Sequence, residues 1–182
     1  MRMTSNTPSH LVLVGPMGAG KSSIGRLLAG RLQRAFVDLD AWIEAEAGTT
    51  ITSIFAKEGE AGFRSRECRA LTRALAQPDA SVIATGGGAV LDEGNRRAMG
   101  AAGIVVYLRV EPAQQTRRLQ GDAARPLLAT DTPAQRLAEL QVIREPLYRE
   151  IADIVFDTSQ DSPESAAVAL AALLSKTSEC CT

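Results

Sequence analysis

The 182-residue sequence predicts one α/β domain, spanning residues 1–182, with a doubly wound parallel sheet. Five short runs rich in Val, Ile and Leu show little alternation of apolar and polar positions, which is typical of strands covered on both faces. Segments with helical spacing of apolar residues separate these runs, and a glycine-rich turn follows the first. The expected strands are His10–Val14, Ala35–Asp40, Ser81–Thr85, Ile104–Val110 and Ile154–Asp157.

Helical patterns fill the intervals between the expected strands. The first has an apolar face that should pack on the sheet, made of Ile24, Leu27, Leu28 and Leu32. The expected helices are Lys21–Gln33, Thr50–Glu58, Ala61–Leu75, Asn95–Gly100, Ala113–Gln120, Pro133–Arg149 and Ser165–Ser175. Pro146 lies inside the sixth of these, so we expect that helix to kink or break near Arg144.

Three further segments complete the expected organisation. Residues from about 43 to 75 form a helical insertion after the second strand, and residues from about 119 to 132 form a mobile loop with few apolar anchors. Residues from about 176 to 182 form a flexible tail.

Composition excludes several classes of protein. The net charge is −1 and 45% of the residues are hydrophobic, so nothing favours nucleic-acid or membrane binding. The chain has no run of 18 apolar residues, and its N-terminal stretch MRMTSNTPSH lacks the apolar region of a signal peptide. The cysteines, Cys68, Cys180 and Cys181, are odd in number, which suits a reducing compartment. We expect a cytoplasmic monomer.

The glycine-rich turn after the first strand predicts a phosphate-binding loop. Gly15, Gly20, Lys21 and Ser22 match G-x-x-x-x-G-K-[ST], with a strand before and a helix after the motif. Such glycines let successive N–H groups point inward at an anion, and the helix N-terminus adds positive potential. Lys21 would contact the β- and γ-phosphates, and the Ser22 hydroxyl would join Mg²⁺ coordination. The alternative is a glycine-rich turn that binds nothing.

Two carboxylates end the second expected strand. Asp38 and Asp40 are two residues apart, so on a strand both would point the same way, towards the edge where doubly wound sheets bind ligands. One could serve Mg²⁺, and the other could accept a hydroxyl proton during phosphoryl transfer. The alternative is an acidic strand end that caps the next helix.

Basic and glycine residues further along the chain are candidates for the side of the site that faces the phosphates. Arg64 and Glu67 are helical neighbours, for which a surface ion pair is the alternative. The three glycines Gly86–Gly88 follow the third strand, which suggests a close backbone approach to a ligand rather than a merely flexible loop. Arg125, in the mobile loop, could close over phosphates, and Arg144 could turn inward at an anion or remain solvated.

The combination of motifs resembles the shikimate kinases over residues from about Leu11 to Ala172. The motifs are GPMGAGKSS, FVDLDAWIE, GFRSRE, ATGGGAV, RPLL and REPLYRE, in that order. The resemblance implies a P-loop fold like that of nucleoside monophosphate kinases, with a five-stranded parallel sheet, a substrate-binding helical insertion and a mobile lid. It also implies Mg²⁺-dependent phosphorylation of the 3-hydroxyl of shikimate by ATP, on the way to chorismate and the aromatic amino acids.

Site residues follow from the resemblance, position by position. ATP would contact Gly18, Ala19, Gly20, Lys21, Ser22, Ser23, Arg118 and Arg125. Shikimate would contact Asp40, Arg64, Gly86, Gly87, Gly88 and Arg144. Mg²⁺ would lie on Ser22 with Asp38 nearby. Catalysis would depend on Asp40 as proton acceptor and on the charges of Lys21 and Arg125.

One position departs from the family pattern, and two rival functions stay open. Asp161 stands where a basic residue often lies against the adenine. A related small-molecule kinase, such as a gluconate kinase, would keep the phosphate loop and lid but lack the joint set of acceptor-side residues. A catalytically silent nucleotide-binding regulator would have lost those residues, and here all are present.

Overall fold

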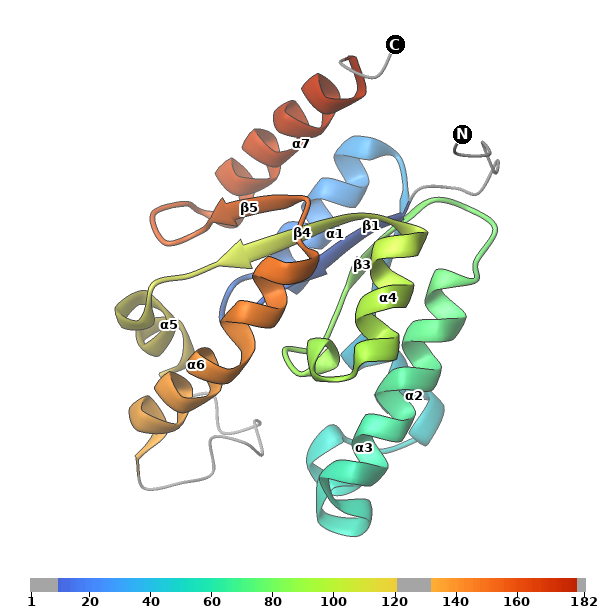
Figure 1. Ribbon diagram of the computed structural model, residues 1–182, viewed down its shortest axis with the longest axis vertical. Helices are drawn as coiled ribbons and strands as arrows, with labels where there is room; N and C mark the ends of the chain where they lie inside the picture. The colour runs from blue at the N-terminus through green and yellow to red at the C-terminus, as the bar shows by residue number, and fades with distance from the viewer. Residues whose placement is uncertain (1–9, 121–131, 180–182) are drawn as a thin grey trace.

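The computed structural model describes residues 10–120 and 132–179, in which helices cover both faces of a five-stranded parallel sheet (Figure 1). The strand order is β2-β3-β1-β4-β5. The strands are β1 (His10–Val14), β2 (Ala35–Asp38), β3 (Ser81–Ala84), β4 (Gly103–Arg109) and β5 (Ile154–Asp157). The helices are α1 (Lys21–Leu32), α2 (Leu39–Ala47), α3 (Ile51–Leu75), η1 (Ala89–Leu91), α4 (Glu93–Ala102), α5 (Pro112–Leu119), α6 (Pro133–Ile151) and α7 (Pro163–Glu179). The predicted five-stranded parallel sheet is confirmed.

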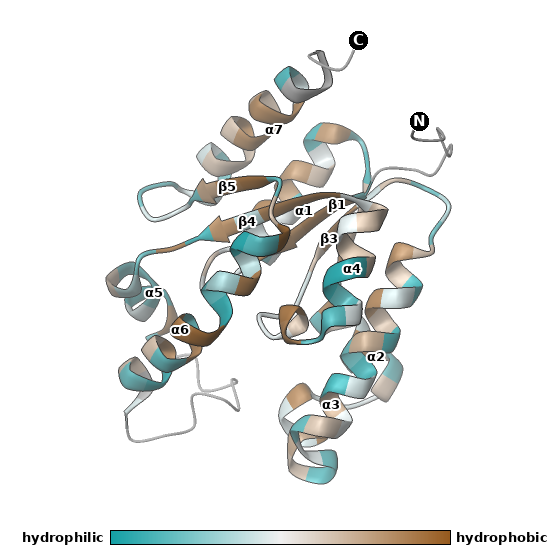
Figure 2. Ribbon diagram, viewed as in Figure 1, coloured by the Kyte–Doolittle hydropathy of each residue, from teal (hydrophilic) through white to brown (hydrophobic). Residues whose placement is uncertain are grey.

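Two hydrophobic clusters bind the helices to the sheet. Val12 and Val14 of β1 face a cluster with residues from α2, α3, α4 and α6. Leu11 and Leu13 face the opposite cluster, which α1 and α7 cover. Both faces of the central strand are therefore apolar, which explains the unbroken apolar runs of the sequence. Figure 2 shows this as brown strands between helices of mixed colour.

The junction after β2 differs from the prediction that Asp38 and Asp40 share one strand. Here β2 ends at Asp38 and α2 begins at Leu39. The Asp38 carboxylate accepts hydrogen bonds from the backbone N–H groups of Asp40 and Ala41, at 3.1 and 3.4 Å. Because a short carboxylate satisfies the first N–H groups of a helix, Asp38 ends the strand as an N-cap and Asp40 lies in the first helical turn.

Helix α3 agrees with the two helices predicted after β2, whereas helix α6 differs from its prediction. In α3, Gly59 has non-helical angles (φ 70°, ψ −176°), so the two helices predicted on either side of residues 59–60 are present with a kink between them. Of the kink or break predicted near Arg144, the break is wrong, because α6 continues through Pro146. A proline removes one backbone hydrogen bond, and here the buried Tyr148 holds the following turn against the core.

The connections of the sheet reverse direction around β1, which lies between β3 and β4. In such folds ligands bind in the crevice outside the carboxyl ends of the strands at this point. The segments that follow β1 and β3 both begin at this edge, so the phosphate-binding motif and the three glycines are brought together. No helix in the described ranges is long and apolar enough to cross a bilayer. The described residues leave out most of the expected lid, including Arg125. They also leave out Cys180 and Cys181.

Candidate functional site

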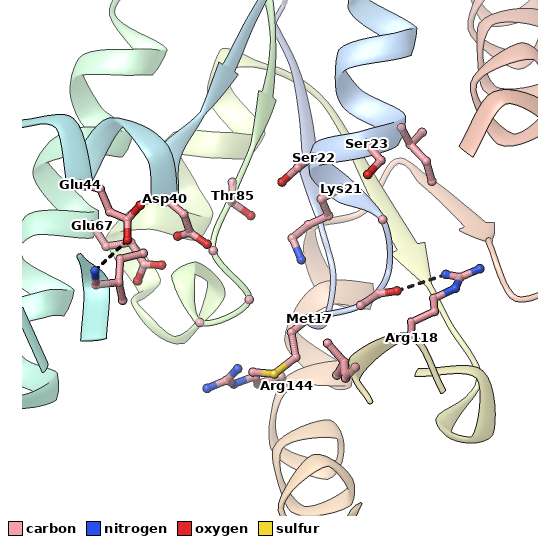
Figure 3. A pocket seen from close by; sticks show the side chains of 18 of the residues that line it. Met17, Lys21, Ser22, Ser23, Asp40, Glu44, Glu67, Thr85, Arg118 and Arg144 are labelled. Carbon is pink, nitrogen blue, oxygen red and sulfur yellow. Dashed lines mark hydrogen bonds between the residues drawn. The ribbon is translucent and has the colours of Figure 1, made fainter. Parts of the chain in front are cut away.

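A cavity of about 770 Å³ lies at the carboxyl edge of the sheet. Its walls come from the loop after β1, helices α1, α2, α3, α5 and α6, and the turn after β3 (Figure 3). It brings together most of the predicted site residues that the structure describes: Gly18, Gly20, Lys21, Ser22, Ser23, Asp40, Arg64, Gly86, Gly87, Gly88, Arg118 and Arg144. Ala19 is buried in the core and Asp38 caps α2, so neither side chain lines the cavity. Arg125 lies outside the described residues.

The loop between β1 and α1 has the backbone of an anion cradle. Gly15, Gly18 and Gly20 have φ angles of 142°, 78° and 88°, which disfavour any side chain. A Cβ on Gly15 would also lie 2.4 Å from the carbonyl oxygen of Leu108. The first turn of α1 contains no acidic residue, so the positive potential of its N-terminus is not neutralised there.

Lys21 lies over this loop. Its Nζ donates hydrogen bonds to the carbonyl oxygens of Gly15 and Pro16, both at 2.8 Å. Figure 3 shows the Lys21 side chain extending from the start of α1 towards the loop that carries Met17. A lysine in this position presents a compact positive charge towards an anion bound at the N-terminus of α1.

Arg118 of α5 braces the phosphate loop. Its guanidinium donates to the carbonyl oxygen of Gly18 at 3.1 Å, and to the hydroxyl and carbonyl oxygens of Thr158 at 3.2 and 2.6 Å. Asp161 and Pro163 line the same end of the cavity, and the Asp161 carboxylate accepts a hydrogen bond from the Ser165 hydroxyl. These hydrogen bonds therefore hold in place the Arg118 side chain, which is predicted to contact the nucleotide.

Arg64 and Glu67 form an ion pair, but in the wall of the cavity and not on the surface, where the alternative interpretation of the sequence placed it. Arg64 Nη1 donates to Glu67 Oε2 at 2.6 Å, and Nη2 to Glu60 at 3.0 Å. Glu67 is only 1% exposed, and burial raises the pKa of its carboxyl, while the Arg64 guanidinium offsets part of that effect. The ion pair and the ligand-facing role are thus compatible, because Glu67 orients Arg64 towards the cavity.

Arg144 is a buried cation with no carboxylate partner among the residues that the structure describes. It is 4% exposed, and within residues 10–120 and 132–179 it forms no ion pair and its Nε has no hydrogen-bond partner. Burial lowers the pKa of its guanidinium. An uncompensated buried charge is costly, so a ligand that carries a negative charge fits this position.

The three glycines after β3 each lie against a site residue. A Cβ on Gly86 would lie 2.3 Å from Glu67 Oε1 and 3.1 Å from Asp40 Oδ1, and one on Gly88 would lie 2.3–2.4 Å from the Arg64 guanidinium. On Gly87 it would lie 3.5 Å from the Gly15 carbonyl oxygen, an ordinary contact. None of the three has a positive φ angle. A side chain at 86 or 88 would therefore displace the Glu67 carboxylate or the Arg64 guanidinium from its place in the cavity wall.

Sequence reasoning missed an apolar wall and a second acidic residue. Phe55 and Phe63, whose ring centroids are 4.8 Å apart, line the cavity with Ile51. Glu44 also lines it and accepts a hydrogen bond from the Ile51 N–H at 2.9 Å. The available signal was its spacing, since Glu44 lies one helical turn after Asp40.

Comparisons with known proteins place the chain among relatives of one kind. The family model described as shikimate kinase matches residues 17–175. A shikimate kinase of Pseudomonas syringae pv. tomato is 51% identical over 167 residues, 92% of this chain and 96% of the relative. One from Chromohalobacter salexigens is 54% identical over 155 residues, 85% of this chain and 86% of the relative.

A solved structure has the same fold and a ligand. The shikimate kinase from Acinetobacter baumannii in complex with shikimate is 43% identical, with a TM-score of 0.90 over 94% of this chain and 95% of its own. A gluconokinase from Sinorhizobium meliloti, 17% identical with a TM-score of 0.60 over 94% of this chain and 95% of its own, shares the fold alone. The chain belongs to the shikimate kinase family.

Proposed function

We propose that this chain transfers the γ-phosphoryl group of ATP to the 3-hydroxyl of shikimate, releasing shikimate 3-phosphate and ADP. The observation that carries the proposal is a single cavity with two unlike halves. One half is a phosphate loop at a helix N-terminus. The other half is lined by the Asp40 carboxylate and by the guanidinium groups of Arg64 and Arg144.

The phosphate half would hold the triphosphate of ATP. The N–H groups from Gly18 to Ser23 would bind the β- and γ-phosphates, with Ala19 contributing only its backbone because its side chain is buried. Lys21 would neutralise charge on the transferring group, and Arg118 would lie beside the base. Arg125, in the expected lid, is proposed as a second charge for that group.

The acceptor half would hold shikimate, which carries one carboxylate and three hydroxyls. Arg64 and Arg144 suit the carboxylate, since a guanidinium offers paired donors and Arg144 lacks an anionic partner among the described residues. The rings of Phe55 and Phe63 would cover the apolar part of the substrate. This assigns the helical region from about 43 to 75 to acceptor binding.

The chemistry is an in-line displacement. The 3-hydroxyl oxygen forms a bond to the γ-phosphorus as the bond from that phosphorus to the β–γ bridging oxygen breaks, and ADP leaves with the electron pair. Asp40 orients the hydroxyl and accepts its proton. Because the transition state in such transfers is loose, positioning and charge neutralisation supply most of the catalysis.

The residues present fit a Mg²⁺ ion held mainly by phosphates. Ser22 lines the cavity at the N-terminus of α1, and no cluster of three or more His, Cys, Asp or Glu in the described residues could form a complete cage. Mg²⁺ prefers few protein ligands together with phosphate oxygens and water. Ser22 would hold the ion, with Asp38 nearby at the start of α2, where its Oδ1 caps the helix. When bound, the ion would neutralise charge on the phosphates.

The test is ADP release measured with shikimate, with gluconate and without an acceptor. Turnover that requires shikimate and Mg²⁺ supports the proposal, and chelation with EDTA should abolish it. Turnover with gluconate alone would favour the related sugar-acid kinases, while ATP binding without turnover would favour a silent regulator. The proposal includes a monomeric state, which light scattering would check. It also includes a cytoplasmic location, which fits the free thiol of Cys68.

A further inference from the structure

Tyr148 is a buried side chain that the proposed mechanism does not use. It lies in α6 one turn after Arg144, on the same face of the helix, and it is 0% exposed. Its hydroxyl donates a hydrogen bond to the carbonyl oxygen of Gly87. Because a buried phenol hydroxyl needs a partner, this bond fixes both the ring and the turn after β3.

Gly87 is the point where the two halves of the site meet. A Cβ on Gly87 would lie 3.5 Å from both the Gly15 carbonyl oxygen and the Met17 N–H nitrogen of the phosphate loop, and 3.6 Å from Arg144 Nη1. Tyr148 and Arg144 also line a small cavity of about 10 Å³ against Pro16 and Met17. A shift of the Gly87 carbonyl would therefore change the spacing between acceptor turn and phosphate loop.

Tyr148 also lies beside Arg144. The two residues are one helical turn apart in α6, and both line the small cavity against Pro16 and Met17. The ring itself is held by stacking on Tyr107 of β4, with centroids 5.0 Å apart and planes at 25°. One rigid side chain thus donates a hydrogen bond to the turn and lies beside the cation that lines the acceptor half.

We infer that Tyr148 is a positioning residue that holds Gly87 and Arg144 at a fixed distance from the phosphate loop. It touches neither substrate in this account, so it acts through the alignment of the acceptor. The inference rests on the proposed function. It concerns the rate of transfer and the binding of the acceptor, and it leaves nucleotide binding unaffected, since the hydrogen bonds of Arg118 and Lys21 are on the other half.

The test compares Tyr148→Phe with Tyr107→Phe. Both changes remove one hydroxyl from stacked tyrosines, but the Tyr107 hydroxyl only accepts a 3.4 Å hydrogen bond from Gln141. We expect Tyr148→Phe to lower kcat/KM for shikimate about tenfold, because the Gly87 carbonyl loses a buried donor. The dissociation constant of a non-hydrolysable ATP analogue should change by less than about twofold in Tyr148→Phe. In Tyr107→Phe, both this constant and kcat/KM for shikimate should change by less than about twofold.

A double-mutant cycle with Arg144→Lys separates positioning from general stability. If Tyr148 acts through Arg144 and the turn, the two losses in kcat/KM will not add, whereas independent structural effects will. Additive losses, equal kinetics for the two phenylalanine variants, or a matching loss of nucleotide affinity would each overturn the inference. Wild-type protein without shikimate-dependent turnover would overturn the proposed function, whereas normal wild-type turnover with an unaffected Tyr148→Phe variant would overturn only this inference.

Discussion

Replacing Gly88 by alanine tests whether the turn after β3 is glycine for reasons of space. A Cβ at this position would lie 2.3–2.4 Å from three atoms of the Arg64 guanidinium. An ordinary contact begins near 3.4 Å, so the guanidinium must move by about 1 Å. Arg64 is held by Glu67 at 2.6 Å, and Glu67 is buried, so the movement disturbs a charge-assisted pair as well as the ligand-facing group.

The size of the effect follows from the bonds at risk. A hydrogen bond to a charged group contributes about 1.5–3 kcal/mol, so a displaced Arg64 should weaken shikimate binding by ~2 kcal/mol. This corresponds to an increase of about 30-fold in KM, since 1.36 kcal/mol is a factor of ten. The matched control is Gly100→Ala in α4, whose Cβ would meet nothing within 4 Å and which should raise KM by less than about threefold.

The assay is ADP release at saturating ATP with shikimate varied, beside thermal unfolding of both variants. A high KM for Gly88→Ala with near-normal nucleotide affinity supports the reasoning. Equal KM values for the two alanine variants would refute it, because the steric difference between the two positions would then have no consequence for the acceptor.

Three further predictions address single groups. Asp40→Asn should lower kcat by about 10²–10⁴-fold with unchanged ATP-analogue affinity, and full turnover would remove Asp40 from the chemistry. Arg144→Ala should raise the KM for shikimate by the equivalent of ~2–5 kcal/mol, and an unchanged KM would contradict the buried carboxylate contact. Since burial raises the pKa of Glu67 above its ordinary 4.5, the stability it contributes relative to Glu67→Gln is greatest below that pH and declines as the pH rises through the folded-state pKa. Urea unfolding of both proteins from pH 4 to 8 checks this, and a pH-independent difference would contradict it.

Local patterns in the sequence were sufficient to predict the strands of the sheet and most of the site residues that line the cavity. The strands are short apolar runs, and the phosphate loop is a contiguous motif between a strand and a helix. The segment after β2 was misassigned because Leu39 is buried and suits a strand as well as the first position of a helix. Only the side-chain hydrogen bonds of Asp38 decide that the helix begins there.

Contacts between distant segments could not be predicted from one sequence. Arg118 reaches Gly18 across 100 positions and Tyr148 reaches Gly87 across 61, and neither spacing has a local signature. The three glycines illustrate the same limit. Their number suggested a closely bound ligand, whereas the structure shows that Glu67 and Arg64 occupy the space where side chains at 86 and 88 would lie. Which side chains share a wall depends on how α3 and α6 pack on one face of the sheet.

A crystal structure with ADP and shikimate bound would test the central claim most directly, namely that one cavity presents an alcohol to a bound triphosphate. The account predicts the shikimate carboxylate on the Arg64 and Arg144 guanidinium groups, and the 3-hydroxyl within hydrogen-bond distance of Asp40 and facing the β-phosphate of ADP. Shikimate bound elsewhere, or with its carboxylate turned away from both arginines, would contradict it.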